Sequence, residues 1–449
     1  MRCFKAYDVR GRLGEELTPD IARTIARAFA EELGARRVVL GHDPRASSEE
    51  LAAAAAEGLR AAGAEVLALG LCGTEEMYFA TDHLGADGGI EVTASHNPMD
   101  YNGMKLVGAG SRPLSDEVFA AVKARAVAAA FGPAATGKLT PVDPRAAYVA
   151  RLLSFVDVGA LRPLKIVVNA GNGAAGPTFD ALARGLEAAG APLGFVRMHH
   201  EPDGSFPNGI PNPLLPENQP VTAEAVRAAG ADLGVAWDGD FDRCFLFDET
   251  GAFVAGEYVV GLLAEVFLAK EAGAAIVHDP RVVWNTQDLV ARAGGRAVMA
   301  PTGHAYLKAA MRANGAVYGG EMSAHHYFRD FMACDSGMIP WLLVAELMGR
   351  SGQSLSQLLA ARRAAFPSSG EVNFRVADAG AMRARIEAIY GPTARDVGRL
   401  DGLSFDMGEW RFNLRSSNTE PLLRLNVEAR GNPDLVAEKV AEISALIAG

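Results

Sequence analysis

A repeated alternation of short apolar runs and helix-like stretches constrains the fold of this chain more than any other feature. An apolar run at 38–40 precedes an alanine-rich helical stretch at 47–62, and a second apolar run follows at 64–69. The same order returns at 165–189 and at 274–293. Because a strand, a helix and a second strand in this order form a parallel β-α-β unit, the sequence predicts three α/β domains.

The end of the chain follows a different pattern. Residues 371–376 and 422–428 alternate apolar and polar side chains in the manner of strands, whereas 379–390 and 435–447 have helical spacing. No long strand-helix-strand series is evident there. A smaller α+β domain is therefore predicted at the C-terminus.

Turn-forming residues divide the chain at three places. They lie near 143–144, near 250–251 and at 366–370. A length of 449 residues allows two to four domains, because a domain has typically about 100–200 residues. The linkers predict four domains, with the bounds 1–145, 146–251, 252–367 and 368–449.

The net charge of the chain argues against two classes of binding partner. Lysine and arginine number 43 against 54 acidic residues, which gives a net charge of −11. A balance of this sign repels nucleic-acid phosphates and anionic membranes, so neither is an expected partner. No apolar stretch approaches the roughly 20 residues of a membrane span, and the four cysteines have no paired spacing. We expect a cytoplasmic protein with reduced thiols.

The loop 238–243 alternates three carboxylates, those of Asp238, Asp240 and Asp242, between two apolar runs. Like charges at this spacing repel one another unless a cation holds them, and carboxylate oxygens suit Mg²⁺ or Ca²⁺. An EF-hand needs glycine at the sixth loop position, where this chain has Arg243, and it needs helices rather than strands on both sides. A magnesium site fits this loop best, and a solvated acidic turn is the alternative.

Residues 93–98 follow a predicted strand and bring a hydroxyl, an imidazole, an amide and a proline together. Ser95 could be a nucleophile with His96 as its base, although neighbours in sequence need not face each other. No GxSxG elbow surrounds Ser95. Lys105 could place a cation over the same loop. The alternative interpretation is a structural turn.

Two further segments carry groups that could hold a sugar or move a proton. Glu321, Ser323 and His325 can hydrogen-bond hydroxyl groups, and His304 follows Gly303 after another apolar run. Either histidine could transfer a proton near neutral pH. A polar turn with a core histidine is the alternative here.

The loop 415–421 has the composition of a phosphate site. Arg415 supplies a forked charged donor, and hydroxyls, an amide and turn N–H groups can bind the remaining oxygens. The N-terminal Tyr7 and Arg10 lie in a segment that adds another arginine. A surface turn, or a salt-bridged turn at the N-terminal segment, remains the alternative.

Together these loops resemble the α-D-phosphohexomutase superfamily, from 4–11 through 415–421 and thus over nearly the whole chain. Within it the sequence looks most like bacterial phosphomannomutases of the surface-polysaccharide type, on the residues 73–79, 238–243, 320–328 and 415–421. Two positions depart from the broader pattern. Phe241 stands where many relatives have a small residue. Asp279-Pro280-Arg281 replaces a more usual Asp-x-Lys, so that Arg281 takes the place of the lysine.

The resemblance implies three similar α/β domains with mixed sheets plus a C-terminal α+β domain, around a central active-site cleft. By this resemblance the four domains carry, in order, a phosphoserine loop, a metal-binding loop, a sugar-recognition loop and a phosphate-binding loop. It also implies a reversible conversion of mannose 6-phosphate to mannose 1-phosphate. That reaction passes through a phosphoserine enzyme and a hexose 1,6-bisphosphate, which also serves as activator, and it supplies GDP-mannose for polysaccharide synthesis.

Roles for individual residues are likewise implied by the resemblance. The catalytic residues would be Ser95, His96, Arg10, Lys105, His304 and His325. Substrate would be bound by Tyr7, Arg243, Arg281, Gly303, Glu321, Ser323, Arg415, Ser417, Asn418 and Thr419. One Mg²⁺ would be held by Ser95, through its phosphate, with Asp238, Asp240 and Asp242. The partner would be a small phosphosugar, bound by a monomer or homodimer.

Three rival functions follow from the same residues. The nearest is a mutase of the same superfamily that acts on glucose or glucosamine phosphates. The motifs around Ser323 and Asn418 argue against glucosamine phosphate as the substrate. Glucose phosphate stays open as a substrate, because glucose differs from mannose only in the stereochemistry of the 2-hydroxyl. From other classes, a phosphosugar-binding protein and a phosphatase that hydrolyses the phosphoserine stay open as alternatives.

Overall fold

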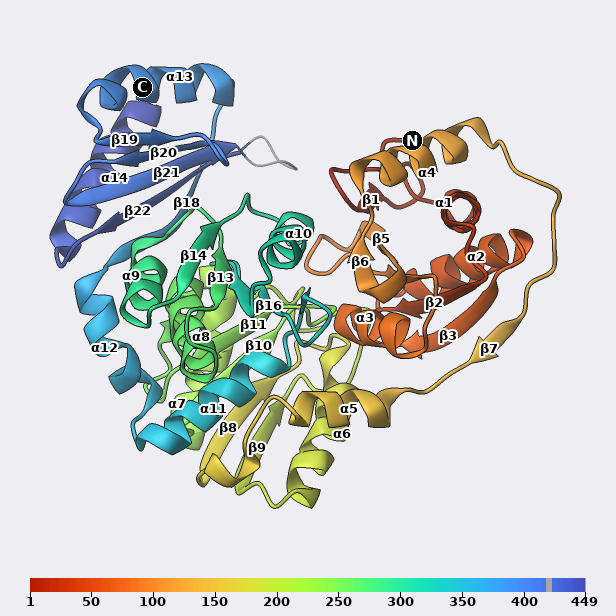
Figure 1. The fold of residues 1–449 in the computed structure, drawn as a ribbon, viewed down its shortest axis with the longest axis horizontal. Helices are drawn as coiled ribbons and strands as arrows, with labels where there is room; N and C mark the ends of the chain where they lie inside the picture. The colour runs from red at the N-terminus through yellow and green to blue at the C-terminus, as the bar shows by residue number, and fades with distance from the viewer. Residues whose placement is uncertain (417–421, 449) are drawn as a thin grey trace. The chain divides into compact units, whose positions relative to one another are not determined.

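The structure, a computed structural model, describes residues 1–416 and 422–448. Its contacts divide the chain into two compact units. The first unit is Met1–Phe253 with Asp330–Gly352, and the second is Val254–Arg329 with the residues from Gln353 onward. Three mixed sheets and a final antiparallel sheet, all with flanking helices, confirm the predicted fold class (Figure 1).

The first sheet has seven strands in the order β1-β5-β4-β2-β3-β7, with β6 paired to β5. The pairs among β4, β2, β3 and β7 are parallel, and those that involve β5 are antiparallel. The strands are β1 (Val9–Arg12), β2 (Arg37–His42), β3 (Glu65–Leu71), β4 (Gly88–Val92), β5 (Tyr101–Gly108), β6 (Arg112–Pro113) and β7 (Leu139–Pro141). The helices are α1 (Pro19–Leu33), α2 (Ser48–Ala61), α3 (Thr74–His83), α4 (Asp116–Ala128) and a 3-10 turn at Ala109–Ser111.

Local sequence signals set the ends of α1. The Thr18 hydroxyl accepts a hydrogen bond from the N–H of Ile21, and Pro19 occupies the first helical turn, where it has no N–H to leave unpaired. Gly34 ends the helix at φ 58°, a left-handed conformation that glycine adopts without steric cost.

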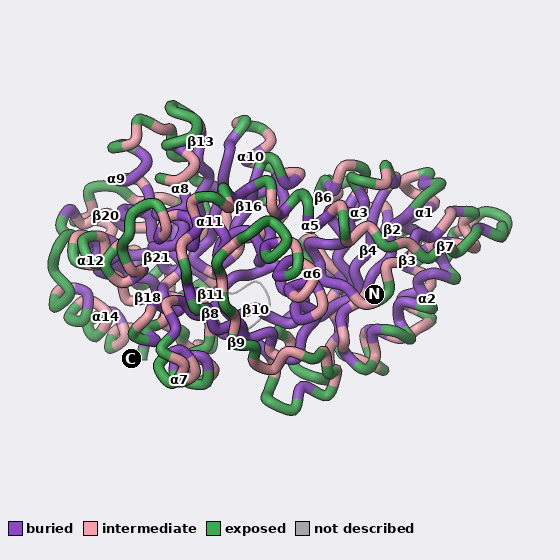
Figure 2. Tube along the Cα trace, turned by 90° about the horizontal axis from the view of Figure 1, so that it is seen from below, coloured by how far each residue is buried: buried purple, intermediate pink, exposed green. Residues whose placement is uncertain are grey.

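The register of this sheet places two loops at one edge. β2 and β4 are parallel, and His42 pairs with Val92 at their carboxyl ends. Every residue of β4 is buried, as expected for a parallel strand covered on both faces, and the tube along β4 is purple in Figure 2. The segments that begin at Asp43 and at Thr93 therefore leave the sheet side by side, at the edge where open α/β sheets bind ligands.

The second sheet also belongs to the first unit and has the order β12-β11-β10-β8-β9. Its strands are β8 (Leu164–Asn169), β9 (Leu193–Met198), β10 (Leu233–Trp237), β11 (Cys244–Phe247) and β12 (Phe253–Val254). The other elements of this part are α5 (Arg145–Leu153), α6 (Ala175–Ala188), α7 (Gln219–Ala229), β17 (Cys334–Asp335), α11 (Ile339–Ser351) and 3-10 turns at Val158–Ala160 and Pro216–Asn218. Trp237 pairs with Cys244 in the antiparallel β10-β11 hairpin, so the loop 238–243 has strands on both sides, as predicted.

Helix α11 explains why the segment 330–352 groups with the first unit. The ring of Trp341 lies 6.0 Å from that of Phe179 and 6.1 Å from that of Phe195, measured between centroids. Most of α11 is apolar and buried, so it is a core helix rather than a surface helix.

The second unit contains the fourth sheet and most of the third. Of the five strands of the third sheet, four lie in this unit in the order β14-β13-β15-β16: β13 (Ala275–His278), β14 (Arg296–Met299), β15 (Tyr318–Gly320) and β16 (His326–Phe328). Its helices are α8 (Gly256–Lys270), α9 (Trp284–Arg292), α10 (His304–Asn314) and α12 (Leu355–Ala365). The fourth sheet has the order β18-β22-β21-β20-β19, from β18 (Ser368–Arg375), β19 (Asp396–Gly398), β20 (Leu403–Asp406), β21 (Trp410–Ser416) and β22 (Leu422–Ala429). Helices α13 (Ala379–Tyr390) and α14 (Pro433–Ala448) accompany it, with a 3-10 turn at Gly391–Thr393.

The turn-rich segment 366–370 is partly a strand in the structure. Strand β18 begins within it at Ser368, and the register with β22 shifts between Ser368 and Glu371. Gly370 has φ 64° at that shift. The glycine and serines thus form a β-bulge inside the sheet, a feature that has the same composition as a loop.

In the part of the chain that the structure describes, no helix combines the length and the apolar character that a membrane crossing requires. All four cysteines are buried free thiols.

Helices α1 and α2 cross at Gly58, where an added Cβ would lie 2.1 Å from the Arg23 carbonyl oxygen. We expect Gly58→Ala to lower the free energy of unfolding by about 1–3 kcal/mol, because overpacking outweighs the better helix propensity of alanine. Urea unfolding measures the change. Ala53→Ser, which adds one atom on the exposed face of α2, is the control. Equal midpoints for Gly58→Ala and the parent would contradict this account of the crossing.

Candidate active site

The loop that carries Ser95 contacts the loop 238–243, although the two leave different sheets of the first unit. The Ser95 hydroxyl donates a hydrogen bond to Asp238 Oδ2 at 2.6 Å. An added Cβ at Gly239 would lie 2.6 Å from the Ser95 carbonyl oxygen. Only glycine therefore allows the two backbones to approach closely enough for this hydrogen bond.

Ser95 has a strained backbone and a nearly inaccessible side chain. Its φ is 48°, a region that residues other than glycine rarely adopt, and its exposed fraction is 6%. The Ser95 N–H donates to Thr93 Oγ1 at 2.8 Å. The hydroxyl also lies 3.0 Å from His96 Nδ1, so these sequence neighbours do face each other.

His96 is held as an acceptor. Arg243 Nη2 donates to His96 Nδ1, the same nitrogen that faces the Ser95 hydroxyl. Burial and the nearby positive charge of Arg243 hold the pKa of His96 well below its ordinary value. His96 Nδ1 is therefore held between the Arg243 guanidinium and the Ser95 hydroxyl.

Two cations pair with the three carboxylates of the loop. Lys105 Nζ, from β5, donates to Asp240 Oδ2 at 2.7 Å and to Asp242 Oδ2 at 2.5 Å. Arg243 donates to Asp238 Oδ2 through Nε at 2.8 Å and Nη2 at 2.7 Å. Lys105 thus reaches the acidic loop across the boundary between the first and second sheets.

The charges of this buried cluster do not balance, since three carboxylates face two cations. Burial raises the pKa of Asp238, and burial together with the charge of Asp240 raises that of Asp242 well above its ordinary value. Burial also acts to raise the pKa of Asp240, but Lys105 outweighs it and lowers that pKa. A further cation would relieve the repulsion among these carboxylates.

The donor set fits a hard metal ion. Asp238, Asp240 and Asp242 each offer an oxygen, and these oxygens lie within 4.8 Å of one another. Asp240 Oδ1 is buried and has no hydrogen-bond partner among the described residues. Buried carboxylate oxygens without a donor are the ligands that Mg²⁺ or Ca²⁺ takes. The cluster could therefore bind a metal, as the alternating carboxylates predicted.

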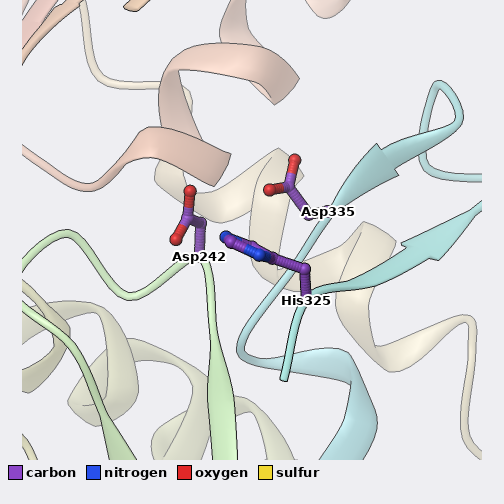
Figure 3. A group of neighbouring side chains, drawn as sticks. All are labelled: Asp242, His325 and Asp335. Carbon is purple, nitrogen blue, oxygen red and sulfur yellow. The ribbon is translucent and has the colours of Figure 1, made fainter. Parts of the chain in front are cut away.

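A fourth carboxylate joins the cluster from β17. Figure 3 labels Asp242, in the loop before β11, and Asp335, at the end of β17, both buried residues of the first unit. Oxygens of these two side chains lie within 4.8 Å of each other. The sequence alternation did not reveal Asp335, because β17 lies 93 positions further along the chain.

The start of α3 supports the same loop. Thr74 Oγ1 donates to Asp240 Oδ2 at 2.6 Å, and the Thr74 N–H donates to the Asp240 carbonyl at 3.1 Å. The next residue, Glu75, is fully buried and accepts hydrogen bonds from four donors. They are Tyr148 Oη, Ser336 Oγ at 3.0 Å, the Gly337 N–H at 2.5 Å and the Met338 N–H at 3.3 Å.

Arg10, near the N-terminal end of β1, lies beside the Ser95 loop. Arg10 Nη1 donates to the Thr93 carbonyl at 2.9 Å, and Arg10 pairs with Asp8 at 4.0 Å. Gly103 permits this approach, since a Cβ there would lie 2.9 Å from the same carbonyl oxygen. Tyr7 is half-buried in the turn before β1.

In the second unit, Glu321 organises the residues predicted to bind a sugar. Its Oε2 accepts from the Gly303 N–H at 3.2 Å and from Arg281 Nη2 at 3.4 Å. Arg281 Nη2 also donates to Ser323 Oγ at 3.1 Å. His325 Nδ1 lies 3.9 Å from Glu321 Oε1. The structure therefore brings these residues together.

His304 begins α10 directly after Gly303, which has φ 128°. That backbone angle is strained for any residue with a side chain, so glycine sets the entry into the helix. The His304 side chain is partly exposed at this helix terminus.

Three arginines of the second unit gather around one carboxylate, that of Glu371. Arg415 Nη2 and Arg424 Nη1 each lie 3.3 Å from it, and Arg281 Nη1 lies 3.8 Å from it. Guanidinium groups supply forked charged donors of the kind that bind an anion. Ser417, Asn418 and Thr419, which the sequence predicts beside Arg415, lie outside the described residues.

The sequence analysis did not identify Thr74, Asp335, Glu371 or Arg424 as site residues. Thr74 lies in the segment 73–79, on which the resemblance rests, so the sequence could have identified Thr74 as a candidate. Glu371 and Asp335 occur in unremarkable strand sequences, and only the tertiary contacts assign them to charged clusters.

Comparison with known proteins identifies the family. The domains of one family match the sequence in order under the description phosphoglucomutase/phosphomannomutase. Its alpha/beta/alpha domains I, II and III match 1–132, 146–251 and 255–366, and its C-terminal domain matches 371–446.

Individual relatives agree. A protein of Salmonella montevideo called phosphomannomutase is 58% identical over 451 aligned positions, which cover 100% of this chain and 99% of that protein. A protein of Xanthomonas campestris called phosphohexose mutases is 57% identical and covers 99% of each chain. A phosphoglucomutase/phosphomannomutase family protein of Burkholderia thailandensis has a solved structure with a TM-score of 0.87, 34% identity and coverage of 99% and 96%. The chain therefore belongs to the phosphoglucomutase/phosphomannomutase family of enzymes.

Proposed function

We propose that the chain interconverts mannose 6-phosphate and mannose 1-phosphate, with Ser95 as the carrier of the phosphoryl group. One observation supports this chemistry above the others: the Ser95 hydroxyl lies 2.6 Å from Asp238 and 3.4 Å from Arg243 Nη2, inside the acidic cluster. The choice of mannose rests on the full-length relatives that are called phosphomannomutase.

In the first half-reaction, a hydroxyl oxygen of the hexose phosphate attacks the phosphorus of phosphorylated Ser95. The new P–O bond to the sugar forms as the P–Oγ bond breaks, the sugar hydroxyl gives up its proton, and Ser95 Oγ takes one up. The product is a hexose 1,6-bisphosphate. In the second half-reaction the bisphosphate, turned around, returns its other phosphoryl group to Ser95 by the reverse of these steps.

Residues of the first unit would align and stabilise the transferred group. Lys105 and Arg243 would neutralise its equatorial oxygens, and Arg10 would add a third positive charge beside the Ser95 loop. His96 is placed to take or return a proton at Nδ1, 3.0 Å from the Ser95 hydroxyl. Tyr7 would complete this part of the substrate contact.

Asp238, Asp240 and Asp242, with the phosphorylated Ser95, would hold one Mg²⁺, which supplies charge neutralisation for the phosphoryl group when bound. Hexose 1,6-bisphosphate would act as activator, because it phosphorylates any enzyme molecule that has lost its phosphate.

Residues of the second unit would recognise the sugar and its second phosphate. Glu321 and Ser323 would bind hydroxyls, with Gly303 and Arg281 holding them in place. His304 and His325 would move protons. Arg415 would bind the phosphate that is not transferred, together with Ser417, Asn418 and Thr419.

The setting of the reaction follows from the same proposal. Mannose 1-phosphate would feed the nucleotidyl transfer that makes GDP-mannose for polysaccharide synthesis. Four buried free thiols suit a reducing cytoplasm. We keep the four domains at 1–145, 146–251, 252–367 and 368–449, and a monomer or homodimer, as parts of the proposal.

Turnover of both sugars tests the proposed substrate. With Mg²⁺ and a trace of hexose 1,6-bisphosphate, the purified protein should convert mannose 6-phosphate to mannose 1-phosphate, and phosphorus NMR follows both species. Glucose 6-phosphate, assayed in parallel, gives the sugar preference. Release of inorganic phosphate in place of isomerisation would identify a phosphatase and overturn the proposal, as would a lack of turnover with Ser95 phosphorylated.

Replacement of the carrier hydroxyl tests the phosphoserine. Ser95→Ala should lose at least about 10³-fold in kcat, because without Oγ no phosphoenzyme forms. Mass spectrometry after incubation with hexose 1,6-bisphosphate should show a phosphorylated parent and an unmodified variant. Ser444→Ala, which removes a hydroxyl bonded within α14, is the matched control. Substantial turnover by Ser95→Ala would rule out this carrier.

Asp240→Asn tests the acidic cluster as a metal site. Loss of one negative ligand should weaken Mg²⁺ binding, as titration calorimetry measures, and lower kcat by about 10²-fold. Asp232→Asn, at a carboxylate that accepts from the Lys165 N–H instead, should leave Mg²⁺ affinity unchanged. If Asp240→Asn bound Mg²⁺ as tightly as the parent, the ion would have to lie elsewhere.

A further inference from the structure

Arg45 is a buried arginine that the proposed mechanism does not use. It follows β2 in the first unit, and its exposed fraction is 3%. Burying a guanidinium costs free energy unless its N–H groups find acceptors. The question is therefore which groups accept from it.

Among the described residues, its two terminal nitrogens donate to three carbonyls of the loop that carries Ser95 and to that of Tyr101, the first residue of β5. Nη2 donates to the carbonyl oxygens of Ser95 at 2.9 Å and Asn97 at 2.6 Å. Nη1 donates to those of Pro98 at 3.0 Å and Tyr101 at 3.3 Å. One rigid fork thus holds four carbonyls between Ser95 and the start of β5.

The face of the guanidinium is covered as well as its edge. Its central carbon lies 5.5 Å from the centre of the buried Phe206 ring. Gly204 lets that segment approach, because a Cβ there would lie 2.0 Å from the Pro44 carbonyl oxygen. A flat group with donors along its edge matches this pocket, and a lysine ammonium does not.

Asp43 connects the same arginine to the other side of Ser95. Its carboxylate lies 3.6 Å from Arg45 Nε and accepts from Thr93 Oγ1 at 2.7 Å. That Thr93 oxygen accepts in turn from the Ser95 N–H at 2.8 Å. The carbonyl of Ser95 is therefore fixed by Arg45 directly, and its N–H is fixed by Asp43 through Thr93.

We infer that Arg45 is a positioning residue for Ser95. It holds the serine backbone at its strained φ of 48°, and this conformation directs Oγ toward Asp238. Strain of this kind persists only where the surroundings over-determine it, and the Asp43–Arg45 pair supplies that constraint. The inference rests on the proposed role of Ser95 as phosphoryl carrier.

Arg45→Lys tests the inference. It keeps the charge but cannot hold four carbonyls, so Oγ should lose its alignment. We expect kcat to fall about 10²-fold while KM for mannose 6-phosphate changes by less than about 3-fold, since Arg45 belongs to no proposed substrate contact. Single-turnover transfer from phosphorylated Ser95 should slow by the same factor as kcat.

Arg60→Lys is the matched control, because the Arg60 Nε also donates to a backbone carbonyl, that of Gly137 at 2.9 Å, away from Ser95. Its kcat should equal that of the parent. If Arg45→Lys retains the parent kcat, or if its only defect is a lower melting temperature that the control shares, the inference is wrong.

Asp43→Asn provides a second test should Arg45→Lys fail to fold. It keeps the size of the side chain but removes the charge that orients Arg45, and kcat should fall about 10-fold at an unchanged KM. An unchanged kcat would overturn the inference. Failure of the proposed function itself is distinguishable, because the parent enzyme would then not convert mannose 6-phosphate to mannose 1-phosphate.

Discussion

The close approach of Ser95 to Gly239 is the constraint on which the rest of the first unit depends. The hydroxyl of one loop can reach the carboxylate of the other only if two backbones come into contact, and a Cβ at Gly239 would lie 2.6 Å from the Ser95 carbonyl. A second close approach of two backbones adjoins the first, since a Cβ at Gly173 would lie 2.7 Å from the Gly239 carbonyl oxygen. The ends of β4, β8 and β10 must therefore be placed accurately relative to one another before any side chain acts.

The charges explain why this contact tolerates so many buried acids. Isolated carboxylates in a protein interior cost several kcal/mol each, on the order of the whole stability of a domain when summed. Lys105 and Arg243 pair with them directly, and the hydroxyls of Ser95 and Thr74 donate to them. The remaining excess of negative charge is a property of the site, because a fully neutralised cluster would have little affinity for a metal ion.

Much of this arrangement was predictable because it is local in sequence. The alternating strands and helices gave the fold class, and the carboxylates at 238–242 showed like-charge crowding within a single loop. The facing of Ser95 and His96 was not predictable, since it depends on a positive φ that the sequence does not encode in an obvious glycine. Nor was Asp335, which enters the cluster from β17, or the bulge at Gly370, whose composition equals that of a linker.

Glu75 has a consequence for how sequences of this family can be recombined. Its carboxylate binds Ser336 and the backbone N–H groups of the next two residues, so positions 261 residues apart form one hydrogen-bonded unit. A chimera with a crossover anywhere between α3 and α11 takes the acceptor from one parent and the turn from the other. Such a chimera retains these bonds only if both parents share the pair, whatever their overall identity, and crossovers outside this interval avoid the requirement altogether.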